Sequence, residues 1–197
     1  IKSRVGGADA RAIVLNPVGS VTDFISHLTW EIHNETLLEL SNSGLLRHFA
    51  GDMFAIRGGI IEAIPEDIVN DDAYIGLALT SKGWKVVHDP TSIVFILGPR
   101  TVSDYIAQRE RVLFGHRQIA KTTGLYPTTF EALALKDPAR AARILIRVLS
   151  KFPPSEWWKF SMAGALEVAS LARSLVNHGR DYAHWKRVDS TKEVICD

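Results

Sequence analysis

Strand-like and helix-like segments alternate over the first 125 residues, and this alternation constrains the fold more than any other feature. Residues 12–15 form a short apolar run, whereas apolar residues recur at helical spacing within 21–40. Further strands are predicted at 53–56, 85–88 and 92–97, a single helical turn at 60–63, and helices at 71–82 and 101–122. Because helices and strands follow one another in turn, the sequence predicts an α/β fold.

The pattern changes after residue 125. Asp137-Pro138 marks a helix start with proline in the first turn, and a helix is expected over 139–151. Another helix is expected over 156–177. No strand pattern remains in this part of the sequence. We therefore predict an α/β domain in residues 1–125 and a helical appendage in residues 126–197.

The composition narrows the class of protein. With 197 residues and 46% hydrophobic content, the chain can bury a core of its own. Its 23 Lys and Arg against 22 Asp and Glu are nearly balanced, so nucleic acid is not an expected partner. A single cysteine, Cys196, excludes an intrachain disulfide and favours a reducing compartment such as the cytoplasm.

Two groups of polar residues suggest chemistry. Asp71 and Asp72 open an apolar helical segment, and Gln108, Arg109 and Arg111 lie together on a later predicted helix. A carboxylate can deprotonate a hydroxyl while arginines stabilise a departing phosphate. The alternative is that the two aspartates only complement the helix dipole and that the arginines form an ordinary charged helix face.

Four segments in this order resemble the acceptor-side, C-terminal half of a family 2 glycosyltransferase of the GT-A type. They are residues 51–57, 64–77, 83–90 and 108–112. The family includes cellulose-, chitin- and hyaluronan-synthase-like enzymes. The resemblance implies a partial GT-A-like mixed sheet with flanking helices. Val112 stands where the family has a tryptophan, which argues against processive polymer synthesis but leaves single transfer intact.

The resemblance also implies roles for individual residues in an inverting sugar transfer. It places Asp72 at the general-base position, with Asp71 orienting a cation or a backbone amide. The remaining residues that it assigns to the donor diphosphate or the acceptor are Gln108, Arg109, Arg111, Gly51 and Asp52. For Asp52, binding a sugar hydroxyl and capping a turn are equally good interpretations.

The resemblance implies ligands as well. The full enzyme would use a uridine-type nucleotide sugar, a sugar or lipid-linked acceptor, and Mg or Mn held mainly by an Asp-x-Asp in a donor half. Around Asp9 this chain has only one carboxylate, so we expect it to be part of an enzyme. The histidines lack metal-ligand spacing, so no metal ligand is predicted here. His116 is at most a candidate for supporting the site.

The last two predicted helices raise the question of a membrane surface. Trp157 and Trp158 begin the final helix, and the helix before it contains basic residues. These basic residues are Arg140, Arg143, Arg147 and Lys151. Such a helix pair could lie at the cytoplasmic face of a membrane, whereas charged residues argue against a spanning helix. The alternative is a small helical bundle with the tryptophans in its core.

Two other functions remain open from the sequence. The chain could be a non-catalytic interaction module, in which the helical part docks on a membrane or a partner protein. It could also be a metal-dependent hydrolase built on Asp52, Asp71 and Asp72, although a third cluster of ligands is missing.

Overall fold

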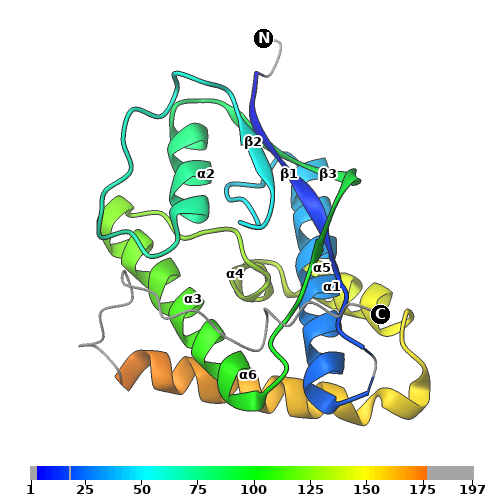
Figure 1. Ribbon diagram of the computed structural model, residues 1–197. Helices are drawn as coiled ribbons and strands as arrows, with labels where there is room; N and C mark the ends of the chain where they lie inside the picture. The colour runs from blue at the N-terminus through cyan, green and yellow to red at the C-terminus, as the bar shows by residue number, and fades with distance from the viewer. Residues whose placement is uncertain (1–3, 18, 177–197) are drawn as a thin grey trace.

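A computed structural model describes residues 4–17 and 19–176 (Figure 1). Within these residues a three-stranded mixed sheet is flanked by helices, which confirms the α/β class. The elements are β1 (Val5–Val14), α1 (Val21–Asn42), β2 (Phe54–Ile56), α2 (Asp71–Ser81), β3 (Lys85–Ile96), α3 (Val102–Thr123), α4 (Phe130–Lys136), α5 (Pro138–Leu149), a 3₁₀ turn (Pro154–Glu156) and α6 (Trp158–Val176).

The central strand of the sheet is β1, which runs antiparallel to β2 and parallel to β3. It begins at Val5, well before the predicted start at residue 12. Its first residues include Gly6 and Gly7, which have low strand propensity. Packing overrides that propensity, because a Cβ at Gly6 would lie 2.7 Å from the Trp84 Cβ. These glycines therefore allow the strand to pass close to its neighbours.

One continuous strand, β3, replaces the two strands predicted at 85–88 and 92–97. The break between them is a local irregularity, because the register with β1 shifts between Ala10 and Arg11. There the Asp89 carboxylate accepts bonds from the backbone and hydroxyl of Thr91 and from the Ser92 hydroxyl. These turn-like hydrogen bonds interrupt the apolar pattern of the sequence, but β3 pairs with β1 on both sides of them. Residues 60–63 form no helix, so that prediction is wrong.

Helix α1 packs against β1 and β3. It begins with a capping box, in which the Ser20 hydroxyl accepts the Asp23 backbone N–H and the Asp23 carboxylate accepts the Ser20 N–H. Farther along, Asn34 bonds both the N–H and the carbonyl of Ala12. These bonds fix the helix to the central strand.

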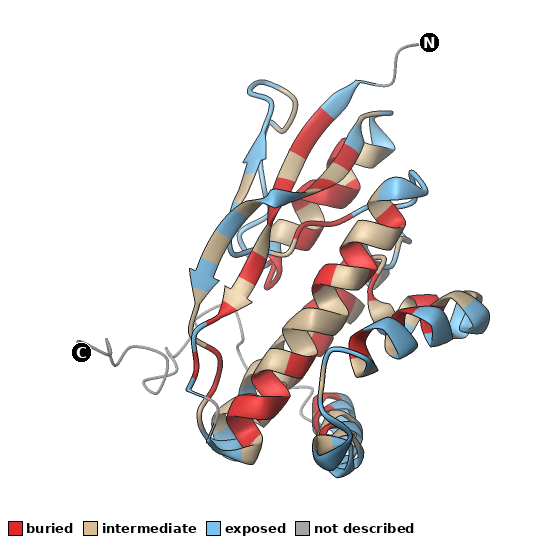
Figure 2. Ribbon diagram, turned by 90° about the vertical axis from the view of Figure 1, so that its right-hand side faces the viewer, coloured by how far each residue is buried: buried red, intermediate tan, exposed pale blue. Residues whose placement is uncertain are grey.

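The helices after residue 125 share the core of the α/β part. Ile144 and Val148 of α5 are fully buried in the same cluster as residues of α1. Helix α4 was not predicted. The Thr129 side chain caps its N-terminus, and Leu133 is its buried residue. Most residues of α6 remain exposed, as its end-on view in Figure 2 shows.

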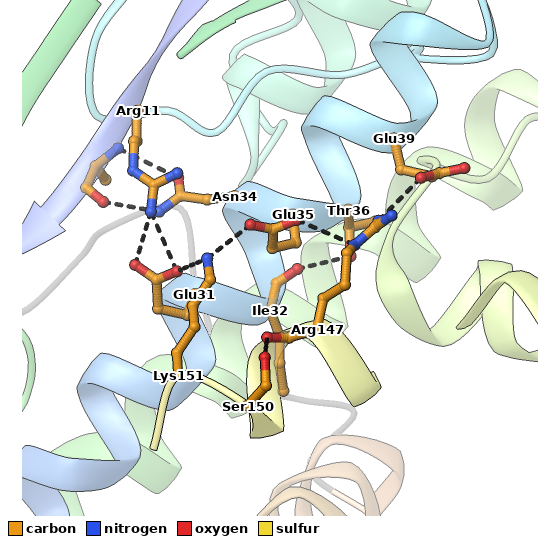
Figure 3. Close-up of polar contacts among 11 residues, drawn as sticks. Arg11, Glu31, Ile32, Asn34, Glu35, Thr36, Glu39, Arg147, Ser150 and Lys151 are labelled. Atoms are coloured by element: carbon orange, nitrogen blue, oxygen red, sulfur yellow. Dashed lines mark hydrogen bonds and ion pairs between the residues drawn. The ribbon is translucent and has the colours of Figure 1, made fainter. Parts of the chain in front are cut away.

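Three of the four basic residues that the sequence offered for a membrane surface lie against α1. Arg147 contacts Glu39 at 2.9 Å, and Lys151 contacts Glu31 and Glu35 at 2.7 Å each (Figure 3). Arg140 lies in the same row, with its Nε 3.8 Å from Glu39. These three charges thus pair with glutamates of the protein itself, whereas Arg143, the fourth residue of the predicted basic set, is exposed.

The tryptophans at the start of α6 are exposed. Trp157 is 48% and Trp158 56% accessible, so the expectation that they lie in a helical core is wrong. In the described part of the chain, no helix combines the length and apolarity needed to cross a membrane. Cys196 and the predicted end of the last helix lie outside the described residues.

Candidate active site

Asn70 fixes the start of α2 against α3. Its side chain is buried and its Nδ2 donates to the Val112 carbonyl at 2.9 Å. A Cβ at Gly115 would lie 2.5 Å from the Asn70 side chain, so only glycine permits this approach. Gln118 holds the preceding loop, because its Oε1 accepts the Val69 N–H at 3.0 Å. This anchor was not predicted from the sequence; the available signal was a glycine, Gly115, inside a predicted helix.

The Asp72 carboxylate lies against the loop that precedes β2. Gly51 in that loop has φ +93°, and a Cβ there would come within 2.6 Å of the Asp72 Oδ2. The structure therefore brings Gly51, Asp52 and Asp72 together, although the loop and the helix are separate in sequence. Asp71 stays at the helix end, where its Oδ1 accepts the Asp72 N–H at 3.0 Å.

Both Asp72 and Asp52 hold their protons more tightly than free aspartate. Burial, reinforced by the neighbouring Asp71 carboxylate, raises the pKa of Asp72 to about 6. Burial of the carboxyl group and the Asp72 charge raise the pKa of Asp52 to about 7, although the residue as a whole is exposed and solvent weakens both effects. Adjacent acids whose raised pKa values lie near neutrality are typical of catalytic sites.

Arg111 provides the positive charge in this cluster. Burial lowers its pKa, and the carboxylates of Asp72 and Asp71 oppose that effect. Its Nη1 donates to the Val69 carbonyl at 3.4 Å, beside the start of α2. Gln108 lies one turn earlier on the same face of α3. Of the three polar residues that the sequence analysis singled out on α3, Gln108 and Arg111 thus share one face of the helix, and Arg111 lies near Asp72.

Arg109 lies elsewhere, because residues two apart on a helix point in nearly opposite directions. Its Nε contacts Glu167 of α6 at 2.8 Å, and its Nη2 contacts Glu131 of α4 at 2.7 Å. Although burial opposes the shift, these glutamates hold the pKa of Arg109 above its usual range. The structure therefore places Arg109 in a contact that joins three helices and not in the Asp72 cluster.

His116 also lies away from the carboxylates. It is buried beside Tyr126, with ring centroids 6.1 Å apart. Burial, together with the nearby His48, lowers its pKa to about 3. The neutral ring is a packing element of the core, and nothing in its surroundings connects it to Asp72.

The acidic cluster does not have the arrangement of a metal site. Over residues 4–17 and 19–176, no group of three or more His, Cys, Asp or Glu side chains could hold a metal ion. The metal-dependent hydrolase would need Asp52, Asp71 and Asp72 as such a group. The acidic cluster therefore does not supply the ligand set that this hydrolase would require.

A cavity of about 480 Å³ lies at the opposite end of α2. Arg47, Trp84 and Lys85 line part of it, and none of the carboxylates of the acidic cluster does. The chemistry that suits group transfer is therefore at the N-terminal end of α2 and separate from this cavity.

Comparison with known proteins gives the family. No curated protein matches the chain. The family model described as Glycosyl transferase family group 2 matches residues 11–175. The matched region includes Gly51, Asp52, Asp72 and Arg111 and covers most of the chain. The chain therefore belongs to glycosyl transferase family group 2.

Proposed function

We propose that this chain is the acceptor-side part of an inverting glycosyltransferase of the GT-A type, with Asp72 as its general base. Membership of the family supports glycosyl transfer in general. The observation that supports the finer assignment is the contact of Asp72 with the Gly51 turn, beside Asp52 and Arg111. An acid of raised pKa beside a turn that has no side chain at Gly51 supports Asp72 as the base for an approaching acceptor.

Asp72 has the basicity that the reaction requires. A carboxyl whose pKa is about 6 is mostly ionised at neutral pH, yet it binds a proton more tightly than ordinary aspartate. General-base catalysis is most effective when the pKa of the base lies near the working pH. In the proposed step Asp72 takes the proton of the acceptor hydroxyl while that oxygen bonds to the anomeric carbon of the donor.

Asp52 has a different role in this scheme. Burial and the Asp72 charge raise its pKa to about 7, so it can carry a proton near neutral pH. A protonated carboxyl can donate a hydrogen bond to the acceptor sugar while the ionised one accepts the proton. Two acids whose pKa values are separated by their surroundings commonly divide their roles in this way.

Arg111 is the proposed partner of the leaving diphosphate. As the bond from the anomeric carbon to the phosphate oxygen breaks, negative charge moves onto the diphosphate. A guanidinium can bind two phosphate oxygens through its planar donors. Gln108 on the same face adds an amide donor. Arg109 has no such role here, because Glu131 and Glu167 already bind it.

The ligands are proposed from the resemblance to the family. The donor would be a uridine-type nucleotide sugar and the acceptor a sugar or a lipid-linked sugar. The donor nucleotide and a divalent Mg or Mn would be bound mainly by residues outside this chain.

A second proposal concerns docking on the cytoplasmic face of a membrane. Exposed apolar side chains continue along α6 from Trp158 to Val168 and Val176, which are 56%, 68% and 78% accessible. Tryptophan is favoured at the membrane–water interface. The Trp157→Ala/Trp158→Ala variant should lose co-flotation with anionic liposomes, whereas Leu135→Ala, at an exposed site on α4, should retain it. Absence of flotation by the unaltered protein would refute the proposal.

The base assignment is tested in the intact enzyme with Asp72→Asn. This isosteric change should abolish sugar transfer while the affinity for the donor stays the same. Asp71→Asn is the matched control, because it removes a carboxylate from the adjacent position and should keep measurable turnover. Full turnover by Asp72→Asn would exclude Asp72 as the base.

A further inference from the structure

A buried Asp–His pair joins β1 to β3 beside the loop that carries Gly51 and Asp52. Asp9 and His88 stand opposite one another in the strand register, and their Oδ1 and Nδ1 atoms are 2.8 Å apart. Both side chains are fully buried. A carboxylate oxygen accepts hydrogen bonds, so the Nδ1 of His88 is the donor in this bond. None of the chemistry described above uses this pair.

Asp9 also reaches the loop that lies on Asp72. Its second oxygen, Oδ2, accepts the backbone N–H of Ala50 at 3.0 Å. The next residue of β1, Ala10, donates its N–H to the Met53 carbonyl at 3.0 Å. Adjacent residues of β1 therefore hold both ends of a short loop. Gly51 and Asp52, which contribute to the acidic cluster, are the two residues between these ends.

The histidine is fixed in turn by its own surroundings. Its backbone N–H donates to the Ser41 hydroxyl at the end of α1 at 3.0 Å. Its Nε2 is buried and finds no hydrogen-bond partner among the residues that the structure describes. The bond to Asp9 is thus the polar contact that orients the ring, as a carboxylate commonly orients a histidine.

We propose that Asp9 and His88 are positioning residues that hold the loop at residues 50–53 against the Asp72 carboxylate. This inference deepens the proposed function and rests on it for its catalytic meaning. An apolar pair could join the two strands equally well, because buried ion pairs add little net stability. Only an acceptor at residue 9 can bind the Ala50 N–H, which specifies where the loop lies.

The experiment uses carboxyl-carbon NMR titration of Asp72 together with amide hydrogen exchange at Ala50. Asp9→Asn keeps the shape of the side chain but turns one of its two acceptors into a donor. Exchange at Ala50 should accelerate about tenfold or more, as expected when a hydrogen bond to a charged acceptor is lost. The titration midpoint of Asp72 should fall from about 6 towards the ordinary value of 3.8, because the released loop no longer shields it.

Matched variants separate positioning from general destabilisation. Asn34→Leu removes another buried polar contact to β1, at Ala12, and should leave the Asp72 midpoint unchanged. His88→Leu should act like Asp9→Asn. His88→Gln, which restores a donor to Asp9, should recover the original midpoint. If Asp9→Asn does not fold, the two His88 variants decide the question.

An Asp72 midpoint that is the same in folded Asp9→Asn or His88→Leu as in the unaltered protein would overturn the proposal. So would an equal shift in Asn34→Leu. These readouts require no turnover. A failure of the positioning role is therefore distinguishable from a failure of the base assignment, which the Asp72→Asn transfer assay tests.

Discussion

Replacing Asp72 with asparagine should stabilise the folded protein at neutral pH while removing its proposed base. The folded pKa of Asp72 is about 6, against 3.8 for the free side chain. A raised carboxyl pKa means that the folded state binds the proton more tightly than the unfolded state. The contribution of the Asp72 carboxyl to the free energy of unfolding is therefore fully present below about pH 3.8 and is lost as the pH rises through about 6.

The size of the effect follows from the shift. A difference of about 2.2 pKa units corresponds to about 3 kcal/mol at pH 8, at 1.36 kcal/mol per unit. Because part of Asp72 reaches solvent and Arg111 attracts its ionised form, we expect a gain of about 1–3 kcal/mol for Asp72→Asn at pH 8. At pH 4 the gain should fall below about 1 kcal/mol, since the folded carboxyl is then already neutral.

Denaturant unfolding at pH 4 and pH 8 measures both values. Asp71→Asn is the control, because it removes a carboxylate from the same helix end without relieving the burial of Asp72. The reasoning fails if Asp72→Asn is destabilised at pH 8. It fails equally if the difference from the unaltered protein is the same at both pH values.

Two further predictions concern the residues around Asp72. Gly51→Ala should destabilise the fold by more than about 1 kcal/mol and reduce transfer, because the new Cβ would meet the Asp72 carboxylate at 2.6 Å in addition to the strain of positive φ. Gly44 also has positive φ but lies in open space, so Gly44→Ala should show the backbone cost alone. Equal losses of stability in the two variants would contradict the contact with Asp72. Arg109→Met should lower the free energy of unfolding by about 1 kcal/mol, because it breaks the ion pairs with the partly exposed Glu131 and Glu167, and it should spare donor affinity. Arg111→Met should instead weaken donor binding. The opposite pattern, measured by denaturation and isothermal titration, would return Arg109 to the site.

Much of the fold was predictable because periodicity and turn signals act locally. Helices α1 and α3 begin within one residue of their predicted starts at 21 and 101, because helical spacing and the caps at Ser20 and Thr101 are local features. The sequence could not predict that β3 continues past Asp89, since only pairing with β1 shows that the turn is an interruption within one strand. It also could not place the tryptophans at the start of α6, because their exposure depends on which neighbours pack there.

The candidate site, like the fold, was predictable only in part. The sequence selected Asp72 and Gly51, but only the tertiary structure shows their contact. Asn70, which holds α2 on α3, and Asp9, which binds the loop at Ala50, are ordinary polar residues until their partners are known. The different faces of Arg109 and Arg111 were predictable, because the angle between positions two apart on a helix is about 200°.

The pH dependence of kcat/KM for sugar transfer by the intact enzyme tests the central claim most directly. If Asp72 is the base, kcat/KM should rise with pH, with a midpoint near 6. Asp72→Asn should abolish the activity, and any residual activity should no longer show this rise. A profile with no inflection between pH 5 and 7, or the same limb in Asp72→Asn, would contradict the assignment.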